Sequence, residues 1–161
     1  MFGIFKKHPK LTSSVIDDIK YNKKFEEYEG KAYVKSFNLT FEVTFKTSID
    51  YAEKCINSLS EELYDKIRDS LINLCNEEVE DYLDDKIYSS LYKLNKNQIM
   101  NHVSDLSIII DESREDQIGY CISGNCEWNE EHGFIIVICD NKIKYVGEHD
   151  NLYSPWDKYK N

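Results

Sequence analysis

CEWNEEHGFIIVIC, residues 126–139, is the stretch that decides the fold. Its first eight residues are polar apart from one cysteine and one tryptophan, and the remainder, Phe134–Cys139, is an unbroken apolar run. A short run of this kind predicts a central β-strand that is covered on both faces. Asp140 and Asn141 come next, and both residue types tolerate the positive φ of a two-residue turn. We therefore expect Lys142–Val146 to pair with the apolar run as a hairpin.

Further strands are predicted upstream of this hairpin. Leu39–Phe45 alternates apolar and polar residues without a fault, which is typical of a half-buried strand. Lys31–Phe37 also reads as extended, and a turn at Ser36–Asn38 joins the two as an antiparallel pair. For residues 8–30 three alternatives stay open: a long loop, an additional strand, or both. Two more strands are expected at Leu106–Ile110 and Gln117–Ile122.

The middle of the chain has the periodicity of helices. A first helix is expected to begin near Ser48, with Thr47 or Ser48 as its cap, and Ser58–Glu61 has the spacing of a second capping box. A further short helix is expected around Asn97–Val103. In the second helix an apolar stripe recurs at intervals of three and four residues, at Leu63, Ile67, Leu71, Leu74, Cys75, Val79, Tyr82 and Leu83.

Strands followed by helices and then by strands is the order of an α+β protein. A length of 161 residues suits one packed core and is short for two ordinary domains. The predicted fold is therefore a single α+β domain over residues 1–161. In it, an antiparallel sheet made from the N- and C-terminal strands packs against a central helical block.

The composition of the chain limits its partners and its compartment. There are 20 Lys and Arg residues against 30 Asp and Glu residues, a formal net charge of −10. This charge repels phosphate groups, so nucleic acid and anionic membranes are not expected as partners, whereas a basic protein is attracted. Solubility alone also favours an acidic surface, and that interpretation carries equal weight. Five cysteines without a Cys-x-x-Cys pair, and an amino terminus without a secretory signal, predict a reduced, cytoplasmic protein.

Two kinds of cysteine site come into question, a zinc site and a nucleophilic cysteine, and the sequence gives little support to either. Cys121, Cys126, His132 and Cys139 are zinc-ligand types, but spacings of five, six and seven residues do not form the close pairs of structural zinc sites. Buried core thiols beside one polar histidine are the favoured interpretation. A nucleophilic cysteine with a histidine base needs a geometry that sequence does not reveal, and no local signature supports one. We therefore predict no metal, no cofactor and no catalytic residue.

The polar segment before the apolar run, residues 126–133, is expected to form a turn, and this polar turn is a candidate site. Glu131 and His132 are an acid and a base side by side, with Trp128 close in sequence, so a small enzyme or ligand-binding site around these three residues is one hypothesis. The other is structural, since polar residues in a connecting turn more often form hydrogen bonds within that turn. Gly133 is expected to supply a backbone angle that other residues resist.

The acidic run Glu77–Asp85 is the second candidate site. Its usual meaning is a solvated helix face. The alternative is a docking surface for lysine and arginine side chains, with Tyr82 and the C-terminal Trp156 as aromatic anchors. The predicted partner-binding residues are Glu77, Glu78, Glu80, Asp81, Tyr82, Asp84, Asp85 and Trp156.

The polar turn also resembles a family motif. An uncharacterised family of small bacterial cytosolic proteins shares the pattern Cys or Asp, any residue, Trp, Asp or Asn, any residue, Glu-His-Gly, followed by an apolar strand and a hairpin. Here the motif residues are Cys126, Trp128, Glu131, His132 and Gly133, with Asn129 where aspartate is commoner. The early Phe2–Phe5 is similar to the opening strand of such proteins. The resemblance implies fold and compartment more than function, and relatives of this size and acidity resemble immunity proteins of bacterial toxins.

Two functions follow as expectations. The first is a non-enzymatic protein-binding module, most concretely an immunity protein that neutralises a cognate toxin, such as a basic nuclease, by direct binding. The second is the small enzyme or ligand-binding protein with its site at Trp128, Glu131 and His132. A pocket around His132 would favour the second function, and an exposed acidic and aromatic face would favour the first.

Overall fold

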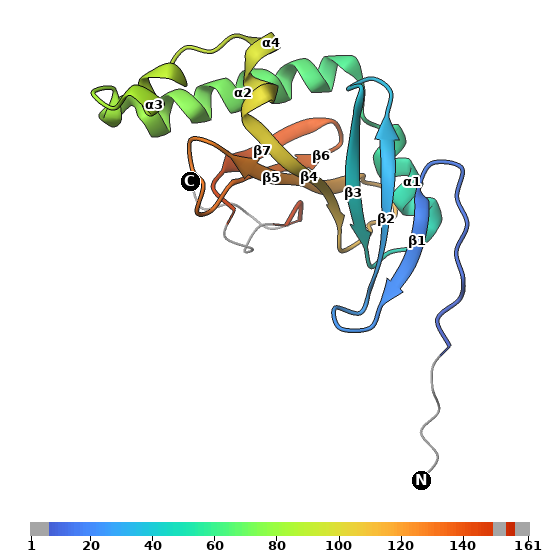
Figure 1. The fold of residues 1–161 in the computed structure, drawn as a ribbon. Coiled ribbons are helices and arrows are strands. Elements are labelled where there is room, and N and C mark those ends of the chain that lie inside the picture. Colours follow the sequence, from blue (N-terminus) through green and yellow to red (C-terminus); the bar gives the residue numbers. More distant parts are fainter. Residues whose placement is uncertain (1–6, 150–153, 157–161) are drawn as a thin grey trace.

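The computed structural model describes residues 7–149 and 154–156. Within them, seven strands form one sheet in which neighbours in space are also neighbours in sequence (Figure 1). The strands are β1 Asp17–Asn22, β2 Glu27–Val34, β3 Leu39–Phe45, β4 Val103–Ile110, β5 Gly119–Cys126, β6 Phe134–Cys139 and β7 Lys142–Gly147. The helices are α1 Ile49–Asn57, α2 Glu61–Val79, α3 Lys86–Ser90 and α4 Lys96–Ile99, with 3₁₀ turns η1 Glu80–Tyr82 and η2 Met100–His102.

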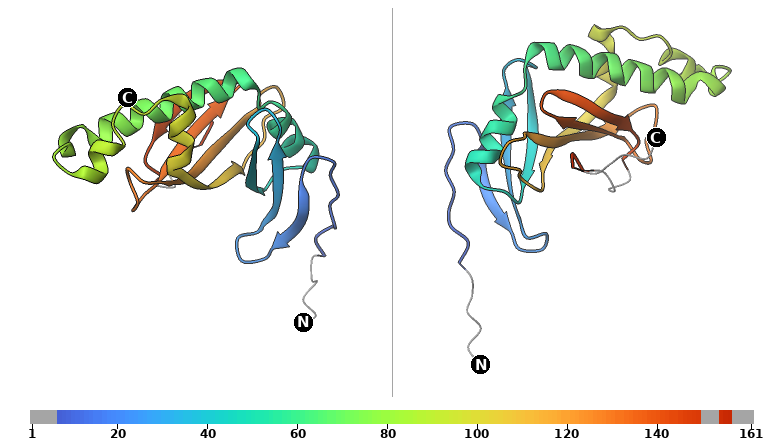
Figure 2. Two further views of the ribbon diagram at one scale, coloured as in Figure 1. Left: turned by 45° about the horizontal axis from the view of Figure 1, so that its top comes forward. Right: turned by 180° about the vertical axis from the view of Figure 1, so that it is seen from behind.

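The helices enter the chain between β3 and β4, and this decides the topology of the sheet. β3 and β4 run parallel, with Val43 opposite Ile108, whereas every other pair of neighbours is antiparallel. A parallel pair needs a crossover connection, and residues 49–102 supply it. The predicted α+β class is confirmed. The finer prediction needs correction, because two antiparallel halves meet at a parallel pair, and α3 lies beyond the sheet instead of joining a central helical block (Figures 1 and 2).

The main core lies between the sheet and α1 and α2. From β3, the predicted alternation places Phe41, Val43 and Phe45 in this core at 1% exposure or less. α2 contributes the predicted stripe as far as Val79, with Leu63, Ile67, Leu71 and Cys75 also buried. Each fully buried large apolar side chain is worth about 1.5–3 kcal/mol, so this contact is what holds the long helix on the sheet.

β6 is buried on both faces, as its apolar run predicts. All six of its residues are buried. Phe134, Ile136 and Ile138 belong to the main core under α2. Ile135 and Val137 point to the opposite face, where they form a smaller apolar cluster with Cys121. The predicted two-residue turn after β6 is also confirmed, because Asp140 and Asn141 have φ of 49° and 60°.

The other local predictions are confirmed with small shifts. Residues 8–30 contain both of the elements left open, a loop before residue 17 and the additional strand β1. The strand predicted at Lys31–Phe37 is β2, which begins earlier, at Glu27, and ends at Val34. Ser48 caps α1, with its hydroxyl accepting from the Tyr51 N–H. The second capping box is corrected by two residues: Ser60, not Ser58, caps α2, and Ser58 ends α1. Phe2–Phe5, the segment that is similar to the opening strand of the family, lies outside the described residues.

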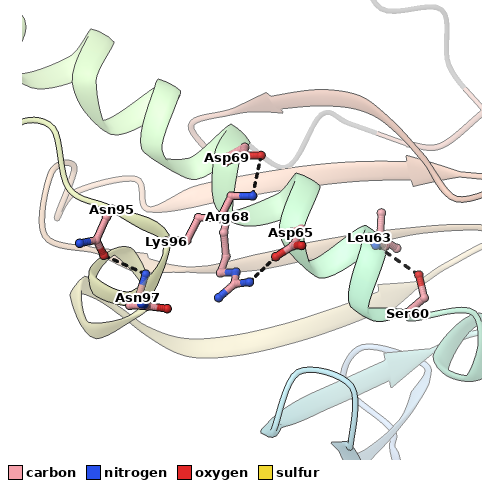
Figure 3. Close-up of polar contacts among 8 residues, drawn as sticks. All are labelled: Ser60, Leu63, Asp65, Arg68, Asp69, Asn95, Lys96 and Asn97. Carbon is pink, nitrogen blue, oxygen red and sulfur yellow. Dashed lines mark hydrogen bonds and ion pairs between the residues drawn. The ribbon is translucent and has the colours of Figure 1, made fainter.

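Polar contacts attach α4 to α2 (Figure 3). Lys96 Nζ lies 3.1 Å from Asp69 Oδ2. The Asn95 side chain caps α4, which begins one residue before the predicted position. α4 is short, yet its Ile99 is fully buried in the main core, so this turn of helix fixes where β4 starts. No helix among the described residues has the length and apolar character needed to cross a membrane.

Candidate functional site

The acidic run does not continue α2 as one helix. α2 ends at Val79, and the run continues through η1 and a turn to Asp85, whose carboxylate caps α3 by accepting from Ile87 N at 2.7 Å. Negative side chains are unfavourable at a helix C-terminus, and like charges four residues apart repel each other. The predicted apolar stripe is therefore too long at its C-terminal end, because Tyr82 and Leu83 lie outside α2 and do not reach the core.

Residues 77–90, which we call the acidic protrusion, project past the sheet (Figures 1 and 2). They contain six acidic side chains and one lysine, a net charge of −5 within a chain of −10. Five of the six predicted carboxylates are exposed. Between them lie exposed large apolar side chains: Tyr82 is 59% exposed, Leu83 38% and Ile87 69%. Only Phe25 and Tyr33 are comparable among the described residues outside the protrusion.

Glu78 is the exception among the predicted carboxylates. It is half-buried and lies close to Asn129 and His132 of the polar turn between β5 and β6. Burial and the nearby Glu148 raise the pKa of Glu78, against the opposing effects of a hydrogen bond from Asn129 and the imidazole of His132. Asn129 Nδ2 also donates to Glu148 at 3.4 Å. The structure thus brings together two candidate sites that are about fifty residues apart in sequence, the start of the protrusion and the polar turn.

The polar turn is held mainly by Asn129. Its side-chain oxygen accepts from the His132 N–H at 3.1 Å, and its carbonyl accepts from the Gly133 N–H at 2.8 Å. The Cys126 thiol donates to the same carbonyl at 3.7 Å. An aspartate carboxylate at position 129 can accept the same His132 N–H, so either residue type suits this position. Gly133 has a φ of 64°, the left-handed angle expected of it.

The residues of the alternative enzyme hypothesis point in different directions. Trp128 is 4% exposed and stacks on Phe134 with ring centroids 6.3 Å apart, so it is part of the core. The His132 side chain is 48% exposed, and its Nε2 lies 3.9 Å from Oε1 of Glu131, which is itself exposed. Trp128 and His132 therefore do not share one enclosed pocket.

A groove of about 350 Å³ lies beside the turn and is built on a different histidine. His102 Nδ1 lies 2.5 Å from Glu127 Oε2, and the Glu127 N–H donates to the His102 carbonyl at 3.1 Å. Both residues line the groove, together with Glu130 and Ser104. A carboxylate that holds one ring nitrogen leaves the other available for a ligand group. With two carboxylates and an imidazole, the groove suits a cationic or hydrogen-bonding side chain.

The thiols are unsuited to nucleophilic catalysis. All five cysteines are free and buried. Burial raises the pKa of Cys126, as well as those of Cys55 and Cys121, to about 12, and raises that of Cys75 to about 11. A thiol is a nucleophile only as thiolate, and these values keep it protonated at neutral pH. Across residues 7–149 and 154–156, no three His, Cys, Asp or Glu side chains gather as metal ligands.

Trp156 lies apart from the acidic protrusion. It packs on the opposite face of the sheet, where its Nε1 donates to the Glu112 carbonyl at 3.2 Å and the Arg114 guanidinium lies 4.6 Å from its ring centroid. The structure therefore brings Tyr82 and the predicted carboxylates together but separates Trp156 from them.

Sequence reasoning missed four residues of this end of the molecule: Leu83 and Ile87 as exposed apolar groups, and His102 with Glu127 as a pair. A signal for the first two existed, since a helix that must stop at an acidic run leaves later apolar residues without a core. None existed for the pair, because His102 and Glu127 are 25 residues apart and meet only through the pairing of β4 with β5.

Comparison with known proteins gives one result. Searches of curated proteins and of solved structures found no match. A scan against protein-family models matched residues 15–153 to a family described as Domain of unknown function (DUF6985). The predicted resemblance to an uncharacterised family agrees with this match, while the motif and the likeness to immunity proteins stay predictions. Because the match spans most of the sequence, the chain belongs to the DUF6985 family.

Proposed function

We propose that this protein is a non-enzymatic binding module that holds a basic protein through its acidic protrusion. One observation carries the proposal: exposed Tyr82, Leu83 and Ile87 stand among exposed carboxylates on a part of the molecule that projects past the sheet. An apolar and aromatic centre with a charged rim is the usual anatomy of a protein interface. Burying Ile87 in a partner would contribute about 1–2 kcal/mol.

The negative charge of the protrusion indicates the class of partner, a basic protein. Five exposed carboxylates and a net charge of −5 in the protrusion attract a basic surface and speed the encounter with it. The groove at His102 and Glu127, beside the polar turn that Glu78 contacts, is a second acceptor for a lysine or arginine side chain. The raised pKa values of the thiols argue against a cysteine enzyme.

In its most concrete form, the partner is a cognate bacterial toxin domain and this chain is its immunity protein. A nuclease fits the charge, because its substrate-binding surface must be basic to hold phosphate groups. The acidic protrusion would cover that surface and exclude the substrate by steric and electrostatic means. What supports this form is the acidity, the small size and the exposed apolar groups of the protrusion.

The direct experiment is affinity capture from the native cell lysate, supplemented with the product of any neighbouring toxin-like gene. The test variant is Tyr82→Ala/Ile87→Ala. The matched control is Phe25→Ala/Tyr33→Ala, which removes two side chains of similar exposure, 53% and 57%, from the other end of the sheet. We expect a basic protein to be retained by the wild type and the control and lost from the test variant.

Charge is tested separately with Asp81→Asn/Asp84→Asn. This variant is expected to slow association with the captured protein and to flatten its dependence on salt, since long-range attraction acts on the association rate. Glu115→Gln/Asp116→Asn removes the same charge from an exposed loop elsewhere and should leave the rate nearly unchanged. Equal retention of the partner by all variants would refute the assignment of the protrusion.

The immunity form has its own test. A toxin-like domain that stops growth when expressed alone should be neutralised by co-expression of the wild type, but not by Asp81→Asn/Asp84→Asn combined with Tyr82→Ala. Full rescue of growth by this triple variant would contradict the proposed mechanism. A captured basic protein with no toxic activity would leave the binding function standing and reject the immunity role.

A further inference from the structure

A cavity of about 330 Å³ lies on the face of the sheet opposite α2. Its floor is the small apolar cluster of that face, with Ile109 from β4, Cys121 from β5 and Ile135 from β6. Ser154–Trp156 and His149 form walls, and Asp111 and Glu112, which follow β4, stand at the side. The volume is within the range of small-molecule sites.

The wall formed by Trp156 is fixed in place by three contacts. The indole Nε1 donates to the Glu112 carbonyl at 3.2 Å, and the Arg114 guanidinium stacks on the ring at 4.6 Å. The indole also lies directly on Gly119, where a Cβ would stand 2.6 Å from Trp156 Cη2. A side chain at position 119 would therefore push the indole off the sheet. The indole thus forms one wall of the cavity, and Gly119 of β5 leaves the space that the indole occupies.

The lining combines an apolar floor with negative charge. Ile109, Cys121, Ile135 and the indole offer apolar surface, whereas the carboxylates of Asp111 and Glu112 are the charged groups. Among the lining residues that the structure describes there is no lysine or arginine, and the nearby Arg114 guanidinium stacks on the indole. Asp111 is close enough to the floor that its charge adds to burial in raising the pKa of Cys121.

We propose that this cavity is a binding site for a small organic cation, a primary ammonium group carried on an aromatic or branched apolar body. The apolar body fits the floor of β4, β5 and β6, and the ammonium group faces Asp111 and Glu112. An anion of the same shape would be repelled by both carboxylates and by a chain of net charge −10. The site is on the other face of the sheet from the acidic protrusion and does not depend on the proposed protein partner.

The experiment uses three probes of one shape on the full chain. They are 2-phenylethylamine, its neutral analogue 2-phenylethanol and the anionic 3-phenylpropionate. Binding is followed in ¹H–¹⁵N spectra, in which the two tryptophans give two indole N–H signals. Trp156→Phe identifies which signal belongs to the cavity.

The expected result has two parts. The amine binds at least about tenfold more tightly than the carboxylate, and it moves the Trp156 indole signal but not that of Trp128, which is buried in the main core. Asp111→Asn/Glu112→Gln lowers the affinity for the amine by about tenfold and leaves the affinity for the alcohol unchanged. Glu115→Gln/Asp116→Asn, which removes the same charge from the same loop without touching the cavity, leaves amine binding unchanged.

Several outcomes would overturn the proposal. One is the absence of saturable amine binding up to about 10 mM, since even a small ligand in a formed pocket should exceed that affinity. Equal affinity for the three probes would remove the role of the carboxylates. Equal loss in the two double variants would reduce the effect to the overall charge of the protein. Thermal unfolding of each variant shows that the compared proteins are folded.

Discussion

Replacing Gly133 by alanine tests whether the polar turn is primarily a structural element. Gly133 has a φ of 64°, and a Cβ there would collide with the Gly124 carbonyl of β5. The left-handed angle costs alanine about 1–2 kcal/mol. Backbone atoms cannot rotate away, so the turn must shift and strain the hydrogen bond from Gly133 N to the Asn129 carbonyl, worth about 1 kcal/mol more. We expect a total loss of about 2–4 kcal/mol in the free energy of unfolding.

Urea unfolding measures this loss, with the fluorescence of the buried Trp128 as one probe and circular dichroism as another. At about 2 kcal/mol per molar urea, the midpoint should fall by about 1–2 M. Gly147→Ala is the comparison, because Gly147 is not in the left-handed region and the atoms that its Cβ would meet belong to a side chain, that of Tyr145, and not to the backbone. It should cost less than Gly133→Ala. A loss below about 0.5 kcal/mol for Gly133→Ala would refute the reasoning.

Two further predictions concern ionisable groups. Burial raises the pKa of Cys126 to about 12, so the thiols should resist labelling by iodoacetamide at pH 8 until urea unfolds the protein; labelling of the native protein at the rate of a free thiol would contradict this. The pKa of Glu78 is raised in the folded state, so folding favours its protonated form, and stability from this group is present at low pH and lost as the pH rises through its titration. Glu78→Gln should therefore raise the melting temperature at pH 7 relative to the wild type and reduce the fall in melting temperature between pH 4 and pH 7, whereas an unchanged pH profile would count against the burial of Glu78.

The sequence predicted those features of the fold that depend on residues close together in the chain. The alternation of Leu39–Phe45 and the apolar run Phe134–Cys139 fix which faces are buried, and Asp140–Asn141 fixes a tight turn, because these depend on side-chain period and backbone angles. The parallel pairing of β3 with β4 has no such signal. It follows from where a crossover of more than fifty residues returns to the sheet, which is set by burial of α2 and Ile99.

The candidate site was predictable to a similar extent. The acidic run was visible in the sequence, but its break at Val79 depends on a balance between helix propensity, repulsion among carboxylates and the end of the core. The contact of Glu78 with the polar turn and the pair His102–Glu127 join residues that only the folded sheet brings together. Trp156 was expected beside the acidic run, and its contact with Gly119 instead depends on the missing side chain of that glycine.

The most direct test of the proposed function compares two tyrosines of nearly the same exposure. A photo-cross-linking phenylalanine analogue is introduced at Tyr82, which is 59% exposed in the acidic protrusion, or at Tyr33, which is 57% exposed on β2. After irradiation of intact cells, adducts are purified and identified by mass spectrometry. The proposed function predicts a discrete adduct with a basic protein at position 82 and none with that protein at position 33. No adduct at position 82, or the same adduct at both positions, would contradict it.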